Sequence, residues 1–278
     1  MKASASNYVA ILLMILAGSV LGCARWQSAE SLRLANPETL PGHHTFVRGQ
    51  LIFHSNFPIA PHHRLVEELV SRRQELTNRL ALPPEGEPVH IYLFDHQDAF
   101  QRFIAQRYPQ FPQRRAYFLK TDTTLAVYAF WGDQVAEDLR HEVTHGYLHA
   151  VVPQIPLWLD EGLAEFFEVP RGHRGINREH LEFFRIRLAQ RDWQPNLERL
   201  ERLDRPLEMT QDQYAECWAW VHLLLEGPPV QRKILPRYLA DLRLTDSSRP
   251  FRWFLRQELG QPEALLLEHL QGLLKETR

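Results

Sequence analysis

Two histidines and a glutamate stand together near the middle of the chain, in the string HEVTH at residues 141–145. On an α-helix, His141 and His145 lie one turn apart on the same face, so both imidazoles can bind one small cation. Glu142 lies beside them with a free carboxylate. A catalytic zinc ion held by three protein ligands keeps a position for water and lowers the pKa of that water to about 7. The pattern therefore predicts a hydrolytic zinc site in which Glu142 takes the proton of the water.

The sequence around this string has the pattern of a helix. Residues 134–150 contain no proline, and Val135, Leu139, Val143 and Ala150 form one apolar stripe at helical spacing. The two histidines fall roughly opposite that stripe, so we expect them to face a cleft. The alternative is an ordinary amphipathic helix whose wet side carries histidines and acids.

The third metal ligand has to come from outside the string. A third histidine on the pattern HExxHxxGxxH is excluded, because Leu148 and Val151 occupy the glycine and histidine positions. His149 extends the stripe, but three histidines on successive turns span about 10 to 12 Å, too far for one ion. We expect His149 beside the site or at the surface. Two carboxylates one turn apart, Glu161 and Glu165, remain as candidates.

The string PLWLDEGLAEFFE at residues 156–168 follows shortly after HEVTH. In this combination the chain resembles the gluzincin metallopeptidases, especially peptidase-MA-like families in which a WLxEG(L/F)A helix follows HExxH. The resemblance implies that Glu161 is the third zinc ligand. It also implies that Glu165 hydrogen-bonds a metal-bound histidine and fixes its tautomer. The alternative is a solvated carboxylate face on this second helix.

One further group is expected, because negative charge develops on the carbonyl oxygen that water attacks. The metal and a hydrogen-bond donor normally stabilise that charge. Tyr214 begins a predicted helix in the second half of the chain, where related families often carry a tyrosine, and it is the candidate catalytic donor. Tyr117, Tyr128 and Tyr147 stay open as alternatives.

The segments before HEVTH alternate between strand and helix patterns. The expected elements are a strand at 45–54, a helix at 62–80, a strand at 89–94, a helix at 97–107 and a hairpin of 116–120 with 124–130. We expect strand 124–130 to be an edge strand beside the metal, where an extended substrate can pair with its backbone; an interior strand is the alternative.

The second half of the chain is helical in pattern from residue 177 onward. The expected helices are 178–191, 211–226, 230–242, 251–259 and 262–277. With the resemblance, the element order predicts an α+β, zincin-like fold. Residues 45–170 would form an N-terminal lobe with a mixed sheet and the active-site helices, and residues 171–278 an all-helical C-terminal lobe.

The N-terminus has the features of a leader. Lys2 precedes an apolar run at residues 9–20, which has signal-peptide length and is too short for a spanning helix. The string VLGC ending at Cys23 looks like a bacterial lipobox, which implies removal of residues 1–22 and acylation of Cys23. An ordinary secretory signal is the alternative. Residues 23–44 have the composition of a tether.

This leader predicts a location in the cell envelope, lipid-anchored to a membrane, and in a Gram-negative cell on the outer membrane facing the periplasm. A lipidated Cys23 leaves Cys217 without a partner, so no disulfide is expected. The formal net charge of −2 gives no basis for nucleic-acid binding. The arginine-rich and aromatic segment at 107–117 contains prolines, so we expect it to be a surface loop.

The expected activity is hydrolysis of peptide bonds in a peptide or protein substrate, with one Zn²⁺ per chain. The alternative is a lipid-anchored envelope assembly or scaffold protein on the same fold, with little or no proteolysis. A third possibility keeps the hydrolysis and changes the substrate to a peptidoglycan cross-peptide. The sequence does not indicate the oligomeric state or a preference for chain ends.

Overall fold

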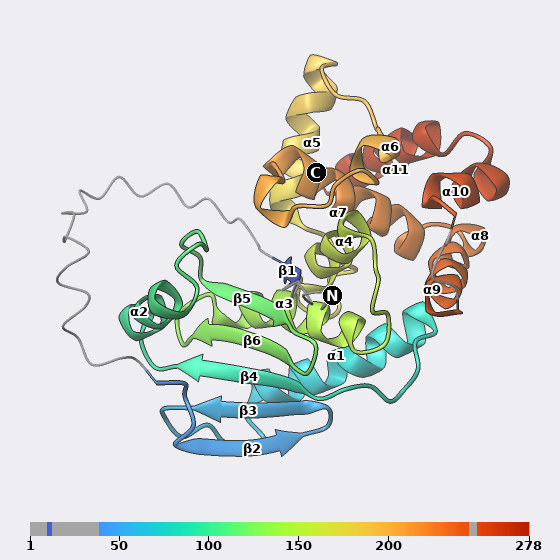
Figure 1. Ribbon diagram of the computed structural model, residues 1–278. Coiled ribbons are helices and arrows are strands. Elements are labelled where there is room, and N and C mark those ends of the chain that lie inside the picture. Colours follow the sequence, from blue (N-terminus) through green and yellow to red (C-terminus); the bar gives the residue numbers. More distant parts are fainter. Residues whose placement is uncertain (1–9, 13–38, 245–248, 278) are drawn as a thin grey trace, which may run out of the picture.

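The computed structural model describes residues 10–12, 39–244 and 249–277 (Figure 1). The expected lipobox with Cys23 lies outside these residues, as does most of the expected signal peptide. Within the described part of the chain, no helix combines the length and the apolar character needed to cross a membrane. The strands are β1 (Ala10–Leu12), β2 (His44–Arg48), β3 (Leu51–Ser55), β4 (Val89–Phe94), β5 (Ala116–Lys120) and β6 (Leu125–Phe130).

The helices follow the predicted order closely. They are α1 (Arg64–Leu80), α2 (Gln97–Arg107), α3 (Val135–His149), α4 (Leu157–Phe167), α5 (Arg178–Gln190), α6 (Leu197–Leu200), α7 (Gln211–Glu226), α8 (Pro229–Arg232), α9 (Ile234–Leu244), α10 (Phe251–Leu259) and α11 (Pro262–Glu276), with a 3₁₀ turn η2 (Pro206–Glu208). The α+β class is confirmed. The single helix expected at 230–242 is wrong, because the chain forms α8 and α9 there.

The N-terminal half forms one mixed sheet in the order β1-β5-β6-β4-β3-β2. Strands β3, β4 and β6 run parallel, while β2 and β5 run antiparallel to their neighbours. The single strand expected at 45–54 is wrong: the segment is a hairpin of β2 and β3. Its turn contains Gly49 with φ +57°, a left-handed conformation that glycine adopts without a Cβ penalty.

The expected edge strand is also corrected. Strand β6 pairs with β4 on one side and β5 on the other, so it is an interior strand. On that side of the sheet β5 lies next to the border, and β1 pairs antiparallel with it, with Ile11 opposite Leu119. Helices α1 and α3 cover one face of the sheet and α2 the other (Figure 1).

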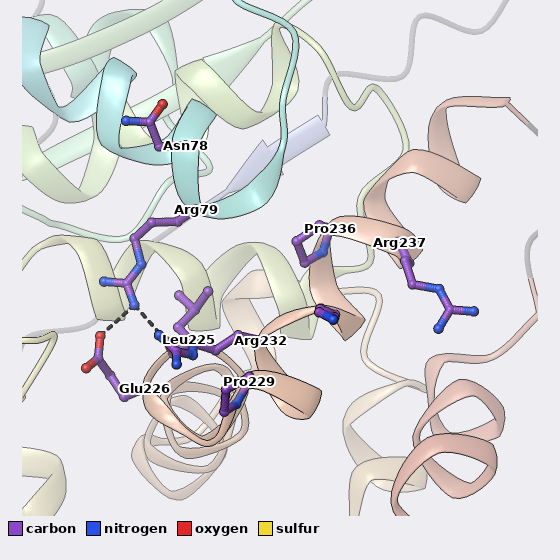
Figure 2. Close-up of a pocket in the computed structure, with 9 residues that line it drawn as sticks. Asn78, Arg79, Leu225, Glu226, Pro229, Arg232, Pro236 and Arg237 are labelled. Carbon is purple, nitrogen blue, oxygen red and sulfur yellow. Dashed lines mark hydrogen bonds and ion pairs between the residues drawn. The ribbon is translucent and has the colours of Figure 1, made fainter.

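Helix α4 connects the sheet half to the helical half. It packs against α3 on one side and α7 on the other. The approach to α7 is very close at Gly162, where an added Cβ would lie 2.5 Å from the carbonyl oxygen of Cys217. A second link is Arg79 at the end of α1, which donates to the Leu225 carbonyl and the Glu226 carboxylate at the rim of a pocket of about 830 Å³ (Figure 2).

A histidine pair joins α7 to α11, with His222 buried and His269 half-buried. His222 Nδ1 and His269 Nε2 lie 2.9 Å apart. Burial lowers the pKa of His222 to about 3 and that of His269 to about 4, from an ordinary value of 6.5. Both side chains are therefore neutral in the folded protein at pH values where the unfolded chain is already protonated.

We therefore expect acid to destabilise the fold between pH 6.5 and about 4. As the pH falls through 6.5 the unfolded chain binds protons at these histidines and the folded chain does not, so the free energy of unfolding decreases. The two histidines contribute about 2.6 kcal/mol each, so the decrease is about 5 kcal/mol at pH 4.5. Urea titrations at several pH values measure it. The double variant His222→Gln, His269→Gln should lose most of this pH dependence, and the exposed-site control His43→Gln should keep it. Equal pH slopes in all three proteins would contradict the assignment.

Candidate metal centre

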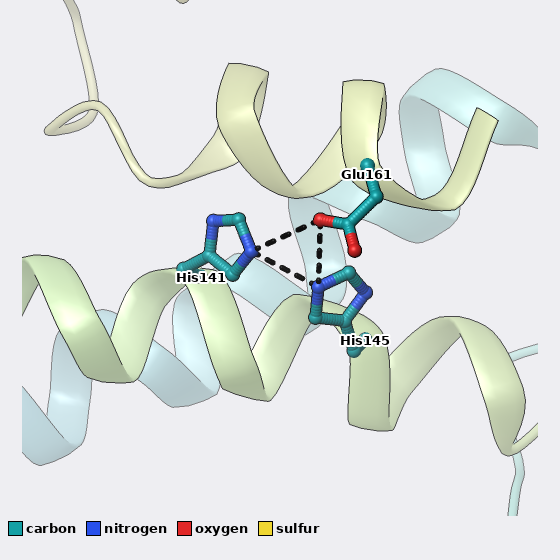
Figure 3. A group of neighbouring side chains, drawn as sticks. All are labelled: His141, His145 and Glu161. Carbon is teal, nitrogen blue, oxygen red and sulfur yellow. Dashed lines mark hydrogen bonds and ion pairs between the residues drawn. The ribbon is translucent and has the colours of Figure 1, made fainter. Parts of the chain in front are cut away.

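Helices α3 and α4 bring His141, His145 and Glu161 together in the interior (Figure 3). The two Nε2 atoms lie 3.0 Å apart, and Glu161 Oε2 lies 3.6 Å from the first and 3.7 Å from the second. Tetrahedral zinc with bonds of about 2.0–2.2 Å holds its ligand atoms about 3.3–3.6 Å apart. The three side chains are fully buried. The predicted ligand atoms therefore lie within a few tenths of an ångström of the spacing of a three-ligand metal site.

Each histidine is oriented by a carboxylate on α4. His141 Nδ1 lies 2.9 Å from Glu168 Oε2, and His145 Nδ1 lies 3.0 Å from Asp160 Oδ1. A carboxylate accepts, so the protons belong on the Nδ1 atoms and the Nε2 lone pairs point toward each other. Such carboxylate–histidine contacts are typical of zinc sites.

The centre requires a positive charge between its three ligand atoms. Neither carboxylate oxygen of Glu161 has a hydrogen-bond partner, although both are buried. Burial acts to lower the pKa of His141, but Glu161 and Glu168 raise it well above its usual value. A proton on His141 Nε2 or a metal ion can supply the charge, and the two compete for the same lone pairs. The buried ligand set fits a divalent cation such as zinc.

Glu142 lies in the same buried region, one residue after His141. Its Oε2 atom has no hydrogen-bond partner. Burial raises the pKa of Glu142 to about 6, although the two histidines act to lower it. A buried carboxylate with a pKa in this range and one oxygen without a hydrogen-bond partner is suited to accept a proton near neutral pH and return it.

The contact expected of Glu165 is made by a different acid. Glu165 accepts from His180 Nε2 at 2.8 Å, whereas Glu168 contacts His141. The reason is the direction of α4: it runs antiparallel to α3, with Asp160 opposite His145, so the residue that reaches His141 comes two turns after Glu161. Burial acts to raise the pKa of Glu165, but its contact with His180 lowers it overall.

The four tyrosines considered as catalytic donors differ in their surroundings. Tyr117 donates to the Pro112 carbonyl, and Tyr147 donates to the Leu69 carbonyl at 3.1 Å. Tyr128 stacks on Tyr92, with ring centroids 5.2 Å apart. Tyr214 is buried near the metal centre, where burial and the charge of Glu161 raise its pKa. The predicted Tyr214 therefore lies within range of a charge interaction with Glu161.

Three residues near the centre were not predicted from the sequence. Asp160 contacts both His145 and His149, the latter at 2.7 Å from Nε2 to Oδ2. Glu168 lies seven residues after Glu161, a spacing that places both on one helix face and would have been a usable signal. Arg114 falls in the segment expected to be a surface loop, but its charge interacts with those of Glu142 and Glu161.

No protein-family model matches the chain, and no curated protein matches it either. The class of site is therefore defined by its geometry: two helical histidines and a carboxylate from a second helix, each histidine held by a further carboxylate.

We expect Glu168→Gln to weaken zinc binding about 10–100-fold, the usual effect of removing an outer partner of a metal-bound histidine. The neutral amide no longer favours the tautomer of His141 that leaves Nε2 free. Competition with a zinc-chelating dye measures the affinity. Glu165→Gln is the matched control and should change it little, because Glu165 contacts His180. A larger loss for Glu165→Gln than for Glu168→Gln would contradict the arrangement.

Proposed function

We propose that this protein is a zinc-dependent metallopeptidase of the gluzincin type, with a zincin-like fold. The observation that carries the proposal is the convergence of three buried metal-ligand atoms beside the unpartnered carboxylate of Glu142. A purely structural zinc site usually has four protein ligands and no open position. Here the described residues within reach supply three ligands and one free base.

Each residue of the site has a separate role in the proposed hydrolysis. Bound zinc supplies an acidified water and a Lewis acid for the carbonyl oxygen. Glu142 accepts the proton of the water and then delivers it to the leaving amine. Glu168 and Asp160 keep the imidazoles in the metal-binding tautomer. Tyr214, within range of a charge interaction with Glu161, is the proposed donor to the negative charge on the attacked oxygen.

Strand β5 lies beside the metal centre. The ring of Phe118 stacks on those of His145 and His149, with centroids 6.0 and 5.4 Å apart. We propose that an extended peptide pairs with this strand by strand addition. Strand β1 pairs with it in the structure, and residues 10–12 belong to the segment 1–22 expected to be cleaved. Cleavage there would free this edge of β5 for a substrate.

The proposal is tested by pairing zinc content with digestion of a broad peptide library. The protein should hold about one zinc per chain and cleave peptides, and removal of the zinc should stop the cleavage. A protein with one zinc that cleaves nothing in the library, and whose Glu142→Gln variant keeps every envelope phenotype of the wild type, would instead be the envelope scaffold protein. The unpartnered Glu142 favours the peptidase, because a scaffold has no need of this carboxylate.

We also propose that the mature chain is attached to a membrane through lipid on Cys23, as the lipobox-like string indicates. Labelling with a palmitate analogue tests this directly. The wild type should be labelled and Cys23→Ser should not. An unlabelled wild type would exclude the anchor without bearing on the metal centre.

A further inference from the structure

Arg114 lies on the loop between α2 and β5, and its backbone is held in place. Gln101 Nε2 on α2 donates to the Arg114 carbonyl at 2.7 Å. The hydroxyl of Tyr117, at the start of β5, donates to the Pro112 carbonyl two residues earlier in the loop. These contacts attach the backbone around Arg114 to α2 and β5.

The guanidinium of Arg114 lies within range of charge interactions with residues of the metal centre. Its charge interacts with those of the carboxylates of Glu142 and Glu161, which come from α3 and α4. Its Nη1 atom is buried and has no hydrogen-bond partner. A buried guanidinium nitrogen without an acceptor is costly, since its desolvation is not compensated. A ligand that supplied an acceptor would remove this cost.

The neighbouring Arg115 differs from Arg114 because its guanidinium has hydrogen-bond partners within the fold. Arg115 is used within the fold: its Nε donates to Asp138 at 2.8 Å and its Nη2 to Glu137 at 3.0 Å, both on α3. Arg115 therefore attaches the loop to the motif helix. Arg114, one residue earlier, has a buried Nη1 atom without an acceptor, and its charge interacts with those of Glu142 and Glu161.

We propose that Arg114 binds a carboxylate of the substrate next to the scissile bond. An arginine fork matches a carboxylate, with two parallel N–H donors for two oxygens. A substrate carboxylate would also add negative charge beside the arginine in a region that already holds Glu142 and Glu161, so the cation is needed to offset it. The carboxylate can be a free C-terminus or an acidic side chain. This inference rests on the proposed peptidase function and names its substrate class.

The test uses peptide pairs that differ only in one charge: the same sequence as free acid and as C-terminal amide, and with glutamate or glutamine beside the cleaved bond. The wild type should cleave at least one anionic member about 10-fold or more faster than its neutral partner, the effect of a hydrogen bond to a charged group. Arg114→Gln should lose this ratio, and Arg114→Lys should keep part of it. Arg115→Gln is the control and should keep the ratio.

A binding measurement separates this inference from the proposed function. Calorimetry on the zinc-loaded Glu142→Gln protein should show about 10-fold tighter binding of the anionic peptide, and the double variant with Arg114→Gln should bind both alike with unchanged zinc content. If the wild type cleaves none of the peptides, the peptidase proposal fails. If it cleaves acid and amide, and glutamate and glutamine peptides, at equal rates, the peptidase stands and the role of Arg114 is overturned. A uniform loss of turnover in Arg114→Gln on all peptides would also overturn it, because that result indicates a cation acting on the attacked oxygen.

Discussion

Replacing Glu142 by glutamine should reduce peptide hydrolysis at least about 10²–10⁴-fold while the zinc content stays at about one per chain. Glutamine has nearly the same shape, so it fills the same buried space, but it cannot accept the proton of the water. The ligand atoms of the centre come from other residues and should be unaffected. Single-turnover rates and metal analysis of the same preparation measure the two properties together.

The matched control for this change is Glu137→Gln on the same helix. Glu137 lies in the first turn of α3 and pairs with Arg115, and it is not one of the three ligand residues. It should keep both its zinc and its rate. A Glu142→Gln protein that hydrolyses peptides at the wild-type rate would remove this residue from the mechanism, and one that loses its zinc would show that Glu142 has a structural part in the centre.

Replacing Glu161 by methionine should abolish tight zinc binding, with a loss larger than the roughly 10–100-fold expected for an outer partner such as Glu168. Wild type should be stabilised by added zinc, by about 2.7 kcal/mol at a free concentration one hundred times the Kd. Glu161→Met should show no such stabilisation. Thermal unfolding with and without zinc measures this.

The same variant has a second expected property. In the zinc-free wild type both oxygens of Glu161 are buried without hydrogen-bond partners, which costs free energy. Methionine fills a similar volume without polar oxygens. We therefore expect zinc-free Glu161→Met to be at least as stable as the zinc-free wild type. A variant that is much less stable and still binds zinc tightly would contradict the role of Glu161 as a ligand.

The two histidine ligands were predicted from local spacing, and Glu161 was chosen over Glu165 from the resemblance to the gluzincins. Two histidines four residues apart lie on one face of any helix, and the carboxylate of the second motif needed only a neighbouring helix to reach them. Element positions in α2, β4, β5 and α10 also match the prediction, because apolar periodicity and proline breaks are local features. These parts required no knowledge of the tertiary fold.

The predictions that were wrong concern contacts between segments that lie far apart in the sequence. The role given to Glu165 belongs to Glu168, since only the antiparallel packing of α4 on α3 decides which acid faces His141. Strand β6 is interior because β5 returns along its free side, which its own residues do not reveal. The segment around Arg114 is a largely exposed loop, as predicted, but its sequence did not indicate that the charge of Arg114 interacts with those of Glu142 and Glu161. Local patterns do not carry such information.

Gly162 follows the predicted ligand Glu161 and has a consequence for motion. Its backbone lies against that of Cys217 on α7, with no room for even a methyl group between them. The ligand-bearing helix is thereby fixed to the helical half, while the ligands on α3 are fixed to the sheet half. A hinge between the halves would separate Glu161 from the histidines, so the centre works only if both halves move as one body. Substrates would then enter a preformed site, and catalysis would not depend on domain closure.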